Sequence, residues 1–155
     1  MSARAAICSP STLGPYGYCA DLSRSWTIGH LPMTNRQRDL YALALEQIRH
    51  NTALLAPGLD FEAFNERSWR LPERLLVNRY SCAVHGVGLA DEWPLVPTHT
   101  DFSKAHGGRF AAGMTVCVES YLGEPGGPDG VKLETQVWIG ESGVERLDSF
   151  PFELD

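Results

Sequence analysis

The sequence lacks several patterns that identify specialised classes of protein. Its cysteines form no CxxC pair, so neither a disulfide framework nor a thiolate zinc site is indicated. No apolar run approaches the roughly 20 residues of a membrane-spanning helix, and no tract is of low complexity. Lys and Arg number 13 against 19 Asp and Glu, and the net charge of −6 argues against binding to nucleic acid or to a membrane.

These absences favour a cytoplasmic protein with reduced thiols. Residues 1–8 are too short and too weakly apolar for a secretory signal. Of the four cysteines, Cys82 and Cys117 lie in strand-like runs, where a buried small hydrophobe is more common than a nucleophile. The 155 residues suffice for one domain with a substantial core.

Acidic residues are absent from the N-terminal segment, and the first acid of the chain is Asp21. Residues 1–13 show little pattern, so we expect them to be irregular. The remainder, residues 14–155, is expected to form one domain.

Hydrophobic spacing predicts a long helix over residues 34–56. Thr34 and Gln37 match a capping box, and Pro57-Gly58 ends the pattern. A shorter helix is expected over residues 61–69 and a helical turn over 73–77. Strands are expected over residues 16–26, 79–84, 114–122, 131–139 and 144–147, with a loop over 95–108. This order predicts an α+β fold with an antiparallel, hairpin-rich sheet.

Four polar residues lie within or at the end of apolar, strand-like runs: Asp21, His85, Glu119 and Glu134. Buried carboxylates need partners or a cation. An oxygen-rich set with one imidazole suits Mn, Fe, Co or Zn, and two such ions about 3.5–4 Å apart would activate a water. The alternative is that each acid faces solvent and that the histidine, which glycines follow, is structural.

Four segments in chain order carry these residues. They are YGYCADLSRS (16–25), HGVG (85–88), GMTVCVE (113–119) and GVKLETQV (130–137). Together they resemble the motifs of the pita-bread metallopeptidases, a superfamily that includes Xaa-Pro aminopeptidase, prolidase, creatinase and methionine aminopeptidase.

The resemblance implies a pita-bread fold, a curved antiparallel sheet with helices on one face, here incomplete at the N-terminus. It implies two divalent ions, with Asp21 and Glu134 bridging them and His85 and Glu119 ligating one of the two. Arg24 would orient a ligand. A small peptide or organic acid would be the substrate, and homodimerisation is common in full-length relatives.

One departure from the family pattern lies at Ser9 and Ser11, where related sequences have Asp-x-Asp. A neutral hydroxyl is a weak ligand, so one of the two metal ions would lack a negatively charged carboxylate ligand. The leading hypothesis is therefore a hydrolase-type domain resembling Xaa-Pro peptidases, impaired by truncation and by loss of this aspartate. A non-catalytic fragment is an alternative.

A second departure follows the metal histidine. Ser81 and the pair Asp91-Glu92 stand where peptidases carry further histidines and a His-Glu pair. The pattern His-Gly-Val-Gly-x-x-Asp-Glu-Trp-Pro is similar to the branch that includes dimethylsulfoniopropionate lyases. There Asp91 would be the catalytic base beside His85, with an apolar wall such as Trp93 raising its pKa; the alternative is that Asp91 caps or salt-bridges a loop. Tyr80 and Trp93 would line the pocket or belong to the core.

Overall fold

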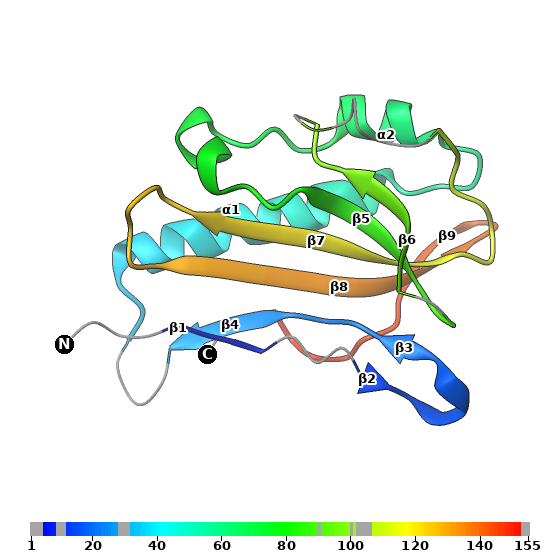
Figure 1. The fold of residues 1–155 in the computed structure, drawn as a ribbon, viewed down its shortest axis with the longest axis horizontal. Helices are drawn as coiled ribbons and strands as arrows, with labels where there is room; N and C mark the ends of the chain where they lie inside the picture. The colour runs from blue at the N-terminus through cyan, green and yellow to red at the C-terminus, as the bar shows by residue number, and fades with distance from the viewer. Residues whose placement is uncertain are drawn as a thin grey trace.

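The computed structural model describes residues 5–8, 12–27, 32–89, 91–99, 101 and 107–152. Its centre is a five-stranded antiparallel sheet with the strand order β6-β5-β7-β8-β9 (Figure 1). The strands are β5 (Cys82–Val87), β6 (Asp91–Pro97), β7 (Thr115–Gly123), β8 (Gly130–Gly140) and β9 (Gly143–Arg146). With its helices, this sheet confirms the predicted α+β class.

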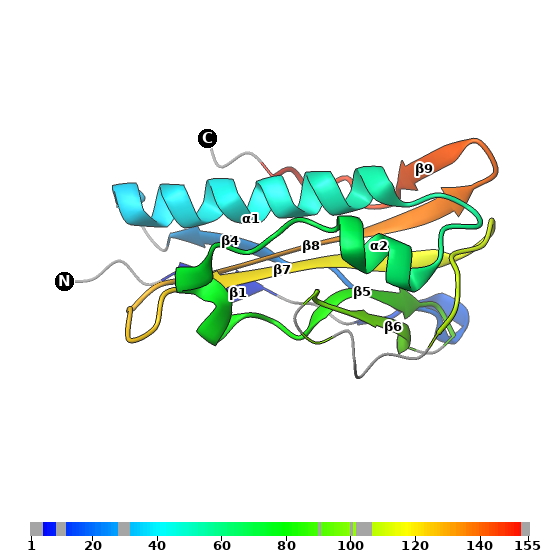
Figure 2. The ribbon, with the colours of Figure 1, turned by 90° about the horizontal axis from the view of Figure 1, so that it is seen from above.

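The long helix α1 (Asn35–Leu54) packs against β7 and β8 on one face of this sheet (Figure 2). Thr34 and Gln37 form the predicted capping box. The apolar stripe of the helix meets alternate residues of the strands, and both sides of this contact are buried: Leu40, Ala44, Ile48, Val116, Val118, Leu122, Leu133 and Val137. No helix within the described ranges is both long and apolar enough to cross a membrane.

A smaller layer covers the β5 side of the core. It contains α2 (Phe61–Arg67) and the 3-10 helix η2 (Glu73–Asn78), close to the predicted ranges. Phe61 and Phe64 pack edge-to-face on Phe110, with ring centroids 4.9 and 5.5 Å apart.

The N-terminal strands lie beside β8. β1 (Ala5–Cys8) pairs with β4 (Arg24–Thr27), and β2 (Thr12–Leu13) pairs with β3 (Cys19–Ala20). The Glu134 N–H donates to the Ser23 carbonyl at 3.0 Å in an isolated bridge, so the residue before β4 is tied to β8 and β4 lies beside that strand (Figure 1).

Two expectations about strands were wrong. The continuous strand over residues 16–26 is interrupted, because the 3-10 turn η1 (Pro15–Gly17) holds Tyr16 at φ 67°. The segment 1–13, expected to be irregular, contributes β1 and β2, because β1 pairs with the non-adjacent strand β4 and β2 pairs with β3 across the turn η1. The loop expected over residues 95–108 begins later, since 95–97 complete β6 against β5.

Of the two glycines that follow His85, Gly86 is expected to tolerate a side chain less than Gly88. A Cβ there would lie 1.9 Å from the Trp93 carbonyl oxygen on β6, whereas a Cβ at Gly88 meets nothing within 4 Å. Gly86→Ala should lower the free energy of unfolding by about 1–3 kcal/mol through overpacking, and Gly88→Ala is the matched control. Urea unfolding followed by circular dichroism measures both; equal midpoints for the two variants would contradict this expectation.

Candidate metal centre

The alternation of the strands brings the predicted ligands to one face of the sheet. His85 on β5 lies opposite Cys117 on β7, and Glu119 on β7 lies opposite Glu134 on β8. Ser120 points the other way and donates to Gln47 of α1 at 2.8 Å. Because successive side chains of a strand alternate between faces, the ligand candidates face away from α1.

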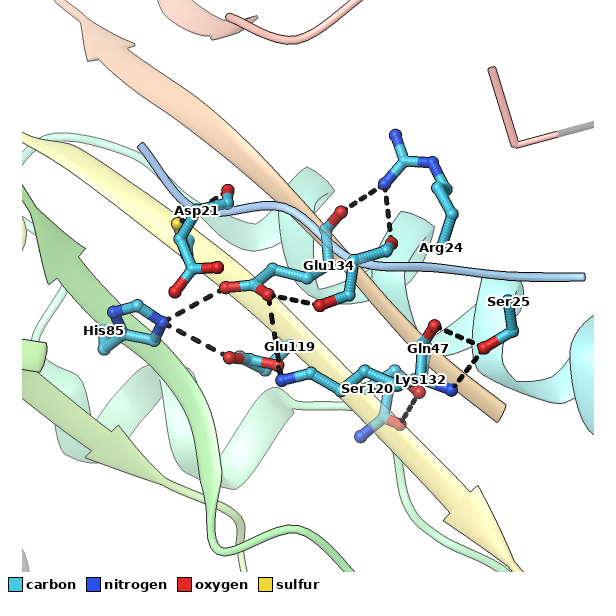
Figure 3. A network of polar contacts seen from close by, with 11 residues as sticks. Asp21, Arg24, Ser25, Gln47, His85, Glu119, Ser120, Lys132 and Glu134 are labelled. Carbon is cyan, nitrogen blue, oxygen red and sulfur yellow. Dashed lines mark hydrogen bonds and ion pairs between the residues drawn. The ribbon is translucent and has the colours of Figure 1, made fainter. Parts of the chain in front are cut away.

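The side chains of His85, Glu119 and Glu134 meet in a buried cluster (Figure 3). His85 Nε2 lies 3.3 Å from Glu119 Oε1 and 3.3 Å from Glu134 Oε1. The exposed fraction of these three residues is 3%, 2% and 0%. Two carboxylates this close repel each other unless a cation lies between them.

The positively charged side chains of His85 and Lys132 offset this repulsion between the carboxylates. Burial by itself lowers the pKa of His85, but hydrogen bonds to Glu119 and Glu134 outweigh it and raise the pKa to about 10. Lys132 Nζ forms a short ion pair with Glu119 and lies 3.8 Å from Glu134. An imidazolium is not a ligand, so a metal ion that binds here displaces its proton.

Asp21 also reaches this cluster. Its side chain is buried and points toward His85 and Glu134 (Figure 3). Its backbone is fixed by two contacts: the Asp21 N–H donates to Gln136 Oε1 at 3.3 Å, and the Cys117 thiol donates to the Asp21 carbonyl at 3.5 Å. Two residues on, the Ser23 hydroxyl donates to Glu134 Oε2 at 2.8 Å and orients that carboxylate.

Arg24 acts on the backbone behind the cluster. Its guanidinium is 1% exposed and donates to the carbonyl of Glu134 and, at 2.8 Å, to the carboxylate of Asp148. Its Cζ lies 3.8 Å from the ring centroid of Phe152. Arg24 therefore ties the strand that carries Glu134 to the C-terminal segment and does not contact the ligand carboxylates of the cluster.

A model of metallopeptidase family M24 matches residues 11–141, most of the chain. The chain belongs to this family. Its predicted membership of the pita-bread metallopeptidases is thereby confirmed.

Two curated relatives of this M24 chain are dimethylsulfoniopropionate lyases DddP. The protein from Roseovarius nubinhibens is 42% identical over 150 residues, which covers 91% of this chain and 32% of the relative. The protein from Roseobacter denitrificans is 41% identical over 145 residues, with the same two coverages, 91% and 32%. The M24 chain thus spans about a third of the length of these relatives.

Solved structures with the same fold are peptidases. Dipeptidase PepE from Mycobacterium ulcerans superposes with a TM-score of 0.76 at 21% identity, covering 97% of this chain and 39% of that one. Prolidase from Pyrococcus furiosus gives a TM-score of 0.69 at 24% identity, covering 88% and 39%. At these identities the likeness establishes the fold, and the predicted pita-bread class is confirmed.

The described residues of the M24 chain fit a metal ion. Ligand atoms of His85, Cys117 and Glu134 all lie within 4.8 Å of one another. Ligands about 2.0–2.2 Å from a tetrahedral ion are roughly 3.3–3.5 Å apart, and His85 Nε2 already lies 3.3 Å from the two carboxylate oxygens. The cluster is buried and rich in carboxylates, as expected for a site that holds a divalent cation.

The structure describes some of the remaining predicted site residues and not others. Asp91 pairs with Val87 at the start of β6, two residues beyond His85 along β5, and its side chain lies outside the described part of the structure. Tyr80 is 36% exposed, and its ring centroid lies 4.4 Å from Lys132 Nζ. Trp93 is 63% exposed and so does not belong to the core. Ser9 and Ser11 lie outside the described residues.

The sequence-based reasoning missed two side chains in this cluster. Cys117 was interpreted as a buried hydrophobe, yet it lies beside His85 and Glu134. Lys132 was not among the predicted site residues, yet it forms an ion pair with Glu119. Each precedes a predicted ligand of its own strand by two residues, and this spacing alone predicts the same face of the sheet.

Glu119→Gln is expected to weaken divalent metal binding at least tenfold. The amide retains one oxygen but removes a negative charge from a buried cluster, and loss of even an outer partner of a ligand costs 10–100-fold in affinity. Isothermal titration with Zn²⁺ measures the change. Glu145→Gln on β9 makes the same chemical change at an exposed position and is the control; equal affinities for the two variants would exclude Glu119 as a ligand.

Proposed function

We propose that the chain carries the metal site of a lyase that acts on a small sulfonium acid such as dimethylsulfoniopropionate. The observation that carries this proposal is the identity of 42% and 41% to two such lyases across 91% of the chain. The superposed prolidase and dipeptidase reach only 24% and 21%. On this proposal residues 14–155 form part of a larger catalytic domain.

The reaction requires a base and a leaving group. A base removes the proton α to the carboxylate, the electron pair forms the carbon–carbon double bond, and the bond to sulfur breaks, releasing dimethyl sulfide and acrylate. We assign the base to Asp91, whose backbone pairs with Val87, two residues from His85 on β5. A metal ion held by Asp21, His85, Glu119 and Glu134 would bind and polarise the substrate carboxylate. The metal is Mn, Fe, Co or Zn, with two ions expected in the family.

Aromatic and cationic groups beside the cluster suit a zwitterionic substrate. The Tyr80 ring accepts the Lys132 ammonium 4.4 Å from its centroid, and the same kind of ring face binds a sulfonium cation. Trp93, on β6 with Asp91, exposes a second aromatic surface.

An Xaa-Pro peptidase is the second candidate, because the solved structures with this fold include prolidases. It is disfavoured by Ser81 and by Asp91-Glu92, which replace residue types expected in peptidases. A non-catalytic fragment is the third candidate, motivated by Ser9 and Ser11. The cytoplasmic location and the homodimer remain predictions.

The three candidates are separated by one assay on the purified chain. The protein is loaded in turn with Mn²⁺, Fe²⁺, Co²⁺ and Zn²⁺ and given either dimethylsulfoniopropionate or proline-containing dipeptides. We expect dimethyl sulfide, measured by gas chromatography, and no dipeptide cleavage. Cleavage of dipeptides alone would favour the peptidase, and turnover of neither substrate by a metal-loaded, folded chain would overturn the lyase proposal.

A further inference from the structure

Cys117 lies beside His85 and Glu134 in the candidate metal-binding cluster, although its neighbours in the sequence of β7 are apolar. It pairs with His85 on one side and with Gln136 on the other, and it precedes Glu119 by two residues. It therefore belongs to the ligand face of the sheet and not to the face that packs on α1. Its exposed fraction is 0%, so its contacts are with protein groups alone.

The thiol is close enough to join the ligands. The Cys117 Sγ, one ring nitrogen of His85 and one carboxylate oxygen of Glu134 all lie within 4.8 Å of one another. Around a tetrahedral ion with a metal–sulfur distance of about 2.3 Å, a sulfur lies roughly 3.5–3.7 Å from nitrogen and oxygen ligands. The separations in the cluster therefore exceed this range by no more than about 1 Å.

The contact of the Cys117 thiol with the backbone also supports its place among the ligands. The Cys117 thiol donates to the carbonyl of Asp21 at 3.5 Å, so the sulfur lies against the backbone of a further ligand candidate. A metal ion entering the cluster forms a bond to Sγ as the S–H bond breaks, and the proton passes to solvent. No change in oxidation state is involved.

We infer that Cys117 is a thiolate ligand of the metal bound between His85 and Glu134, and that it makes this centre selective for Zn²⁺, Fe²⁺ or Co²⁺ over Mn²⁺ and Mg²⁺. Thiolate favours the softer ions, whereas a site of carboxylates and water favours the harder ones. The inference rests on the metal site of the proposed function and adds to it a ligand and a selectivity.

Co²⁺ is the probe, because a thiolate bound to it produces a charge-transfer band in the near-ultraviolet. We expect this band in the Co²⁺-loaded wild-type chain and its loss in Cys117→Ser. Cys82→Ser is the matched control, because Cys82 is also a buried cysteine thiol of the central sheet and lies outside the cluster. The preference for Zn²⁺ over Mn²⁺ in competition titrations should fall at least tenfold in Cys117→Ser and stay constant in Cys82→Ser.

The wild-type chain alone provides an independent measurement, should Cys117→Ser fail to fold. X-ray absorption of the Zn²⁺-loaded protein should show a sulfur neighbour at about 2.3 Å. A bound ion without a sulfur neighbour, or a band that persists in Cys117→Ser, overturns the inference and leaves the metal site standing. Absence of bound Co²⁺ by mass spectrometry defeats both the inference and the metal site on which it rests.

Discussion

Asp91→Asn is expected to lower kcat for dimethyl sulfide release about 10²–10⁴-fold, the usual contribution of a general base. The amide cannot accept the α-proton of the substrate, whereas the metal ligands His85 and Glu134 are unchanged. Metal content, measured by mass spectrometry, should therefore equal that of the wild-type chain. A loss confined to kcat, with metal bound, distinguishes a base from a ligand.

Glu92→Gln is the control for this variant, because it makes the same change of charge at the adjacent position of β6. It should retain activity within a few-fold. If both variants lose activity equally, the acids act through local charge or loop structure and the assignment of the base to Asp91 fails. Full activity in Asp91→Asn leads to the same conclusion.

Arg24→Met is expected to lower the free energy of unfolding by about 3 kcal/mol, the lower end of the roughly 3–5 kcal/mol cost of removing one partner of a buried ion pair, because Arg146 remains 3.2 Å from Asp148. Arg24 and Asp148 are 1% and 7% exposed and lie 2.8 Å apart. The methionine also removes donors to the carbonyls of Glu134 and Phe150. Urea unfolding of the metal-free chain measures the loss.

Arg109→Met supplies the comparison. Arg109 forms an ion pair with Asp60 at 3.3 Å, but the two side chains are 69% and 57% exposed, and exposed pairs contribute little. Its unfolding midpoint should match that of the wild type. A similar loss in both variants would show that the stabilisation comes from general charge balance and not from the buried contacts of Arg24.

Local signals in the sequence predicted the helices and the later strands well. The capping box of Thr34 and Gln37 and the spacing of Leu40, Ala44 and Ile48 place α1 within two residues of its observed bounds. β7 and β8 are long strands that contain several β-branched residues and pair with each other along most of their length. The strand propensity of their residues therefore agrees with the observed pairing. The N-terminal strands were predicted poorly, because β1 and β4 are stabilised by partners distant in sequence.

By itself, the sequence determined the family and supplied the candidate metal ligands, because residue type and order suffice to match Asp21, His85, Glu119 and Glu134 to the family's motifs. Tertiary structure decided which other groups meet them. Strand register places Cys117 opposite His85 and brings Lys132 to Glu119, and long-range packing buries Arg24 behind Glu134. Register and packing depend on pairing between strands far apart in the chain, and no local pattern of residues encodes that pairing.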